Sequence, residues 1–237
     1  RSQLLLELQE GWVKQFRNLE EIVIMLDRKR CLFLCGENNQ GKTNFLESLY
    51  FLGNLTSPRE KYLHNLIREN TDSFVVGADI VGKTASHRVY VKLDREGRRF
   101  LLLNDKRPPS IKAYKQQFNS VYISSDSIRI FLESPDYRRA QLDRFCGRYL
   151  PEYQPLKKMF DKVLYQRNIA LRKKVSQKEI EIWDTKFISV SSQIISYRLK
   201  AIEALSKTLE KLSEAVDWKL PEASVVYHIK KGEGDGF

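Results

Sequence analysis

Cysteine and histidine are scarce in this chain, which has three of each among 237 residues. Cys31 and Cys35 lie four positions apart in an apolar run and cannot bridge each other if that run is extended. Cys146 falls in a predicted helix. Unpaired cysteines favour a reducing, cytoplasmic setting. The histidines are scattered, so no cluster has the spacing of a metal site.

Long apolar runs are also missing. No segment reaches the length of a transmembrane helix, and the first residues do not have the pattern of a signal peptide. We find no internal repeat and no low-complexity segment. The composition, 42% hydrophobic and 30% charged, is that of a globular protein, and the length suits one large domain or two lobes.

Acidic residues are too few to balance the basic ones. The chain has 41 Lys and Arg against 30 Asp and Glu, a formal net charge of +11. This excess suits a polyanionic partner, which would be nucleic acid or, less favoured, an anionic membrane surface. A basic surface kept for solubility is the alternative, and the charge alone does not decide between them.

The clearest motif is a phosphate-binding loop of the form G-x-x-x-x-G-K-[ST]. An apolar run at 30–35 precedes it and predicts a buried strand, while apolar residues at helical spacing follow it to about Gly53-Asn54. A chance match in a strand–turn–helix unit is the alternative, and the correct flanks disfavour it. The candidate nucleotide-binding positions are Gly36, Asn38, Asn39, Gln40, Gly41, Lys42 and Thr43.

The chemistry of this loop follows from its backbone. Successive N–H groups wrap around a β-phosphate, and the helix that follows directs its positive end at the anion. Lys42 can reach the β- and γ-phosphates, and the Thr43 hydroxyl can ligate Mg²⁺. Asn39 stands where many such loops have glycine, and asparagine tolerates a left-handed conformation.

The rest of the pattern predicts strands first and helices later. Strands are expected at 4–8, 21–26, 74–80, 87–93, 99–103, 120–124 and 224–229. A helix should begin at Ser134-Pro135, and a long helical hairpin should cover 155–175 and 177–216. Its apolar stripe, which includes Ile188, Leu199 and Leu212, is interpreted as core. The hairpin surface carries a basic set: Lys157, Lys158, Arg172, Lys173 and Lys174.

Taken together, several stretches resemble the RecF family of bacterial DNA-repair ATPases. The phosphate loop alone indicates only a P-loop NTPase, whereas the later blocks are more specific. The order and spacing are similar to those of the N-terminal part of RecF. The stretches are Phe16-Arg17-Asn18, Gly36 to Asn44, Leu46-Glu47, Leu49-Tyr50, Ser57, Arg59, Leu66-Ile67-Arg68, Ser134-Pro135, Arg138-Arg139, Leu142-Asp143, Tyr153, Leu164, Gln166-Arg167-Asn168 and Trp183-Asp184.

The resemblance implies an α/β fold of the ABC-type P-loop ATPase head, related to Rad50 and SMC proteins, with a mixed sheet around the phosphate-loop helix and an inserted helical lobe. ATP-binding lobe I would cover 1–133, helical lobe II 134–217, and 218–237 would begin the return into lobe I. RecF-like proteins bind ATP with Mg²⁺, pair two heads around it and grip DNA at single-strand/duplex junctions. With RecO and RecR they help to load RecA, which implies a cytoplasmic, nucleoid-associated protein and no membrane.

The resemblance also suggests roles for residues outside the loop. Arg17 and Asn18 match an early Phe-Arg-Asn motif close to the nucleotide, and Arg59 matches an arginine just beyond the first helix. Asp126 falls where related heads carry the Q-loop, which senses Mg²⁺ and the γ-phosphate. The family usually has Ser-Pro-Glu-Asp there, and this chain has Ser124-Ser125-Asp126-Ser127, so the assignment departs from the pattern. For Arg138, Arg139 and Asp143 the favoured interpretation is an intra-helix ion pair.

The remaining parts of such an active site do not occur in residues 1–237. The signature motif, the Walker B acids and the switch histidine would follow Phe237, and both ends of the chain look cut. We therefore expect a chain without a complete catalytic set, which binds nucleotide and does not turn it over alone. The alternatives are another SMC-like or OLD-like P-loop head, or a non-catalytic DNA-binding scaffold. The intact Gly41-Lys42-Thr43 disfavours the scaffold.

Overall fold

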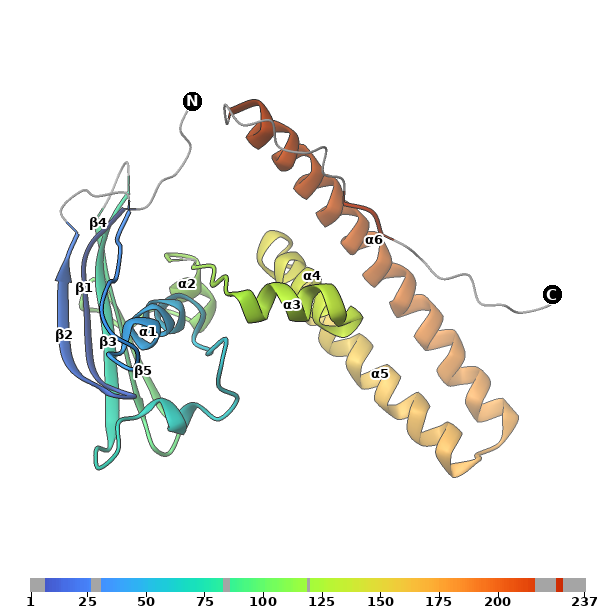
Figure 1. Cartoon of the computed structure of the whole chain (residues 1–237). Helices are drawn as coiled ribbons and strands as arrows, with labels where there is room; N and C mark the ends of the chain where they lie inside the picture. The colour runs from blue at the N-terminus through green and yellow to red at the C-terminus, as the bar shows by residue number, and fades with distance from the viewer. Residues whose placement is uncertain (1–6, 27–30, 83–85, 119, 216–224, 228–237) are drawn as a thin grey trace. The chain divides into compact units, whose positions relative to one another are not determined.

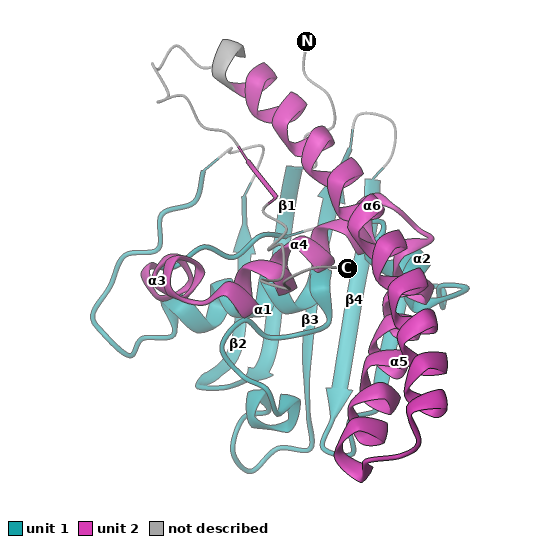
Figure 2. Cartoon of the chain, turned by 90° about the vertical axis from the view of Figure 1, so that its right-hand side faces the viewer, with its two compact units in different colours: residues 1–124 teal, residues 125–237 magenta. Residues whose placement is uncertain are grey.

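The computed structural model describes the chain except for residues 1–6, 27–30, 83–85, 119, 216–224 and 228–237 (Figure 1). The chain divides into two compact units, Arg1–Ser124 and Ser125–Phe237, which are coloured separately in Figure 2. The lobe limits expected from the sequence, 1–133, 134–217 and 218–237, stay predictions. Among the described residues, no helix has the length and apolar character needed to cross a membrane.

The first unit is built on a five-stranded sheet with the order β2-β1-β3-β4-β5, and every strand pair in it is antiparallel. Alternating apolar residues give the strands one buried face, which is the usual pattern of an antiparallel sheet that is covered on one side. The elements are β1 (Glu7–Phe16), β2 (Leu19–Met25), α1 (Lys42–Asn54), the short helix η1 (Leu63–Leu66), β3 (Ser73–Val81), β4 (Ser86–Asp94), β5 (Arg99–Leu103) and α2 (Ile111–Lys115).

Helix α1 covers the buried face of this sheet, where it packs on β1, β3 and β4 (Figure 1). The rings of Phe16 and Phe51 each meet Phe74 edge to face at 5.0 Å between centroids. All three side chains are fully buried. Edge-to-face aromatic contacts add to the free energy of burial, so this triad fixes α1, and the loop that precedes it, on the sheet.

The sequence pattern predicted most elements of this unit correctly. Strands β3, β4 and β5 and helix α1 lie where the pattern placed them, and β2 begins two residues before its predicted start. The first strand is described from Glu7 and continues to Phe16, and residues 4–6 of the predicted strand lie outside the described residues. Half of the predicted strand at 224–229 also lies outside them, and its described part, 225–227, is not a strand.

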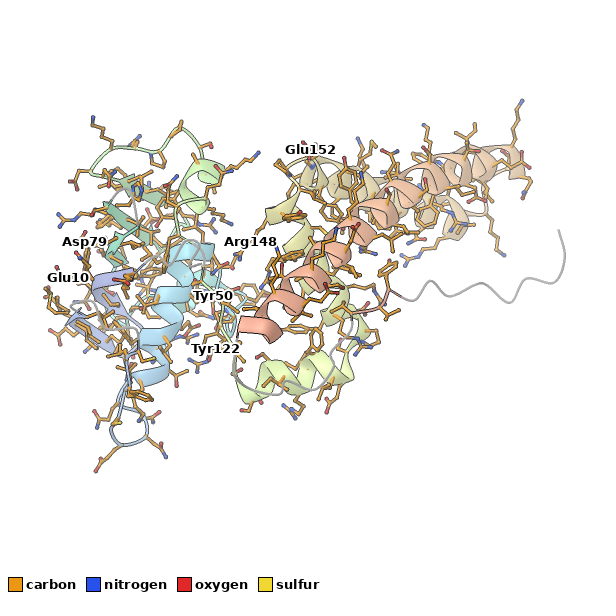
Figure 3. The ribbon with its side chains drawn as sticks, turned by 90° about the horizontal axis from the view of Figure 1, so that it is seen from above. Glu10, Tyr50, Asp79, Tyr122, Arg148 and Glu152 are labelled. Carbon is orange, nitrogen blue, oxygen red and sulfur yellow. The ribbon has the colours of Figure 1, made fainter. Side chains whose placement is uncertain are left out.

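Two predicted strands were wrong. Of the strand predicted at 30–35, residues 31–35 have no regular structure and are largely exposed, no described strand pairs with them, and residue 30 lies outside the described residues. Apolar residues alone do not make a strand, because the backbone groups of a strand must pair with a neighbour. The segment 120–124 is held by side chains instead. Asn54 Nδ2 donates to the Ser120 carbonyl at 3.0 Å, and the ring of Tyr122 meets that of Tyr50 at 6.1 Å (Figure 3).

The second unit is helical. Ser134 caps α4 through its hydroxyl, which accepts a hydrogen bond from Tyr137 N at 3.2 Å, and the predicted start at Ser134-Pro135 is confirmed. The predicted hairpin is confirmed as well, with α5 and α6 side by side in Figure 1. The helices are α3 (Ser125–Glu133), α4 (Pro135–Tyr149), α5 (Tyr153–Lys173) and α6 (Gln177–Ala215).

The apolar stripe of the hairpin is only partly core. Of its residues, Ile202 is buried and Ile195 is half-buried, but Ile188 and Leu199 are exposed. The interpretation of the whole stripe as core was wrong for these exposed positions, and Leu212 is exposed too. The 39 residues of α6 extend beyond the 21 residues of α5, so the shorter helix covers only part of the longer one.

Charged side chains link the helices of this unit. Arg139 pairs with Asp136 three positions before it, within α4. Arg138 donates instead to the carbonyls of the last turn of α3. Asp143 pairs across helices with Arg198 of α6, at 2.6 Å from Nη2. The expected intra-helix ion pair among Arg138, Arg139 and Asp143 was therefore wrong, because Arg139 pairs with Asp136 and Asp143 pairs with another helix.

Candidate nucleotide-binding site

The phosphate loop joins an irregular segment to α1, whose first residue is Lys42. Three of its residues have positive φ, namely Gly36 at 150°, Asn39 at 66° and Gly41 at 90°. Asn39 thus adopts the left-handed conformation, which asparagine tolerates better than most residues. Residues 36–40 are exposed at the start of a 13-residue helix, where unpaired backbone N–H groups can receive an anion.

Lys42 folds back over the loop. Its Nζ donates to the Gly36 carbonyl at 2.6 Å and also to the Glu37 carbonyl. The ammonium group is therefore held at the loop, where the motif requires it. A phosphate that binds there must take over one or both of these hydrogen bonds.

The turn between β1 and β2 packs against the phosphate loop and is hydrogen-bonded to it. Arg17, with φ of 50°, and Asn18 form this turn. Asn18 Nδ2 donates to the Asn39 carbonyl at 2.9 Å. A Cβ on Gly41 would lie 2.3 Å from Leu19 Cδ2, so only glycine lets the loop lie this close to the turn. The Phe-Arg-Asn motif and the phosphate loop therefore form one packed structure.

A buried carboxylate organises the arginines of the site. Glu47 of α1 is fully buried, and Arg17 binds it through Nε at 2.6 Å and Nη2 at 2.9 Å. Ser57 Oγ donates to it at 2.5 Å, and Arg59 Nη1 lies 3.2 Å from it. Arg59 Nη1 also donates to Asn44 Oδ1 at 3.0 Å. Arg17 and Arg59, which are far apart in the sequence, thus meet at one carboxylate.

The structure brings most of the sequence-predicted residues together. The loop residues, Arg17, Asn18 and Arg59 belong to one hydrogen-bonded region, and Thr43 is exposed in the first turn of α1. Asp126 belongs to the second unit, where it lies in the first turn of α3 and pairs with Arg129 at 3.2 Å. Its role as a Q-loop residue stays a prediction.

Sequence reasoning missed Glu47, Asn44 and Ser57 as parts of this site. Glu47 was noted only as a point of resemblance, although a carboxylate among the apolar positions of a helix needs a buried cation. That requirement is the signal that the sequence offered. Among the described residues, no group of three or more His, Cys, Asp or Glu side chains could hold a metal ion.

Known proteins with similar sequences were compared with the chain. No protein-family model matches it. The DNA replication and repair protein RecF of Halothermothrix orenii is 31% identical over 207 residues, which is 85% of this chain and 54% of that protein. RecF of Clostridium novyi is 33% identical over 192 residues, 81% of this chain and 53% of that protein. The chain therefore spans about half the length of the curated relatives it matches.

A solved structure agrees with these relatives. The structure of the recombination mediator protein RecF-ATPrS in the RecFOR pathway superimposes with a TM-score of 0.71 and 24% identity, and the match covers 90% of this chain and 58% of that one. Such a likeness establishes the fold. The α/β fold class and the resemblance to RecF expected from the motifs are both confirmed. The chain is therefore similar in sequence to about half of these RecF proteins, and it shares the α/β fold of a RecF structure.

Proposed function

We propose that the chain is the ATP-binding part of a RecF-type DNA-repair ATPase. The observation that carries this proposal is the loop at 36–43, with left-handed residues at the start of α1 and the Lys42 ammonium bonded to loop carbonyls. A RecF structure named with an ATP analogue is similar over 90% of this chain, which supports the same ligand here.

The residues of the site fit a triphosphate. The loop backbone would hold the β-phosphate, and Lys42 would contact the β- and γ-phosphates. Thr43 would supply one oxygen ligand to Mg²⁺, and a bound Mg²⁺ would neutralise charge on the phosphate oxygens. Arg17, Asn18 and Arg59 would stabilise the loop and its anion. We assign Asp126 to the Q-loop only through the resemblance.

We further propose that the chain binds DNA. The net charge of +11 and the RecF relatives support it. At the end of the α5–α6 hairpin four exposed cations lie close together, and in the described chain none of them pairs with a carboxylate. They are Arg172, Lys173, Lys174 and Lys178. Lys157, by contrast, is occupied by Asp161 at 2.6 Å.

The finer assignments rest on the relatives. We propose an ATP-driven homodimer that binds single-strand/duplex junctions and supports RecA loading with RecO and RecR, in the cytoplasm at the nucleoid. Residues 1–237 lack the signature and Walker B motifs, so we propose that this chain alone binds ATP without hydrolysing it. The alternatives are an SMC-like or OLD-like head and a non-catalytic DNA-binding scaffold, and only the scaffold predicts no ATP binding in the titration below.

Equilibrium titration with Mg-ATP tests the central proposal. We expect saturable binding to this chain, no binding to Lys42→Ala, and unchanged binding to Lys92→Ala, which alters an exposed lysine of β4. Absence of ATP binding in every protein would contradict the proposal and favour the scaffold.

The DNA-binding proposal is tested by comparing the affinity of the chain for duplex DNA with a single-strand gap and for blunt duplex DNA. We expect tighter binding to the gapped DNA. The slope of log affinity against log salt concentration should become less steep when the four hairpin cations are neutralised. The expected change is up to about 3.6, at about 0.9 for each lost phosphate contact. An unchanged slope would place the DNA contacts elsewhere.

A further inference from the structure

We infer that Glu47 is a positioning residue, which holds Arg17 and Arg59 beside the phosphate loop and thereby sets the preference of the site for ATP over ADP. This inference rests on the proposed ATP-binding function. It assigns a role to a side chain that lies inside the fold and does not touch the nucleotide itself.

Stability alone does not account for a carboxylate at this position. The Glu47 side chain is 0% exposed and is satisfied by two guanidinium groups and the Ser57 hydroxyl. Removing a charge from water costs so much that a buried ion pair is often no more stable than apolar residues of the same shape. What the carboxylate does provide is direction, since it fixes the planes of two guanidinium groups.

The position of Glu47 on α1 directs those groups toward the nucleotide. Thr43 and Glu47 are four residues apart on the helix, so they lie on the same face, one turn from each other. Thr43 is exposed at the mouth of the loop, and Glu47 is buried one turn behind it. Guanidinium groups bound to Glu47 therefore lie on the face of α1 that carries the expected Mg²⁺ ligand.

A continuous series of hydrogen bonds joins Arg59 to the loop. Arg59 Nη1 donates to Asn44 Oδ1 at 3.0 Å, Asn44 Nδ2 donates to Asn18 Oδ1 at 2.8 Å, and Asn18 Nδ2 donates to the Asn39 carbonyl at 2.9 Å. Asn39 is one of the left-handed residues of the loop. A shift of Arg59 would therefore reach the backbone that receives the phosphates.

Both arginines keep donors for a further anion. Arg17 uses Nε and Nη2 on Glu47, and Arg59 uses Nη1 on Glu47 and Asn44. Among the described residues, Arg17 Nη1 and Arg59 Nη2 have no hydrogen-bond partner. Their side chains are 21% and 41% exposed. These free N–H groups suit the oxygens of a third phosphate, which ATP has and ADP lacks.

The Glu47→Gln variant tests the inference by titration with Mg-ATP and Mg-ADP. Glutamine keeps the shape and one acceptor but loses the charge that orients both arginines. We expect the ATP affinity to fall at least tenfold and the ADP affinity to change less than threefold, because the loop backbone and Lys42 still hold the β-phosphate. The control Glu20→Gln, which alters an exposed carboxylate 3.7 Å from Arg68, should leave both affinities unchanged.

A double-mutant cycle separates positioning from general stability. If Glu47 acts through Arg59, adding Glu47→Gln to Arg59→Ala should cost much less ATP affinity than Glu47→Gln costs alone. Equal losses for ATP and ADP in a folded Glu47→Gln protein, or additive effects in the cycle, would overturn the inference. If Glu47→Gln does not fold, Asn44→Ala carries the same test, because it cuts the link from Arg59 to the loop.

ATP binding by the unsubstituted chain shows whether the role of Glu47 or the proposed ATP-binding function has failed. ATP binding that is lost in Lys42→Ala but insensitive to Glu47→Gln would refute only the role of Glu47. Absence of ATP binding in the parent chain would refute the proposed function, and the inference with it.

Discussion

The Asp143→Ala substitution should destabilise the helical unit strongly. Asp143 accepts hydrogen bonds from Tyr153 Oη at 2.5 Å and from Arg198 Nε and Nη2 at 2.8 and 2.6 Å. Burial, and then the hydrogen bond to Asp143, raises the pKa of Tyr153, so its hydroxyl stays protonated and donates. Without the carboxylate, Arg198 keeps only the neutral Tyr227 hydroxyl, 3.0 Å away, from this network.

The expected loss in the free energy of unfolding depends on how deeply Asp143 and Arg198 are buried. Breaking one side of a buried ion pair costs about 3–5 kcal/mol, because the remaining charge is left without a partner. The side chains of Asp143 and Arg198 are 17% and 11% exposed, so water can reach the orphaned guanidinium in part. We therefore expect the lower end of that range, a loss of about 3 kcal/mol in the free energy of unfolding.

Urea unfolding followed by the helical circular dichroism signal measures this loss. The matched control is Asp136→Ala on the same helix, where a 90% exposed carboxylate pairs with Arg139. It should cost less than about 0.5 kcal/mol. The double variant Asp143→Leu/Arg198→Met should recover part of the loss, because it removes both charges. A loss for Asp143→Ala no larger than that of the control would refute the reasoning.

Three further predictions concern other regions. Burial raises the pKa of the Cys146 thiol to about 11, so an alkylating reagent at neutral pH should label the two exposed cysteines and reach Cys146 only after unfolding; mass spectrometry would reveal any contrary labelling. Gly77→Ala should lower stability by about 1–3 kcal/mol, because its Cβ would lie 2.2 Å from the Trp12 indole. Thermal unfolding should show most of that loss disappear in a Trp12→Ala background, and an equal loss there would disprove the clash. Hydrogen bonds from Arg88 lower the pKa of Asp79. The stability from this pair is present above the unfolded pKa of about 3.9 and vanishes as pH falls through the folded value. Arg88→Gln should therefore cost about 0.5–1 kcal/mol at neutral pH and nothing in strong acid, and a loss that persists in acid would contradict this.

Local patterns in the sequence determined the phosphate loop and most elements around it. The loop motif is continuous, and its function depends on backbone angles that Gly36, Asn39 and Gly41 provide wherever the loop is placed. The caps and periodicity of the helices are also local, which is why α4 and the α5–α6 hairpin were predicted correctly.

The tertiary structure alone decided which segments find partners. The run at 31–35 and the segment 120–124 have the composition of strands, but no described strand pairs with either, and a strand depends on such pairing. Glu47 and Arg17 are thirty residues apart, and only the packing of α1 on the sheet makes them neighbours. The arrangement of charges around the phosphate loop is therefore a property of the fold, because it depends on contacts that no local pattern encodes.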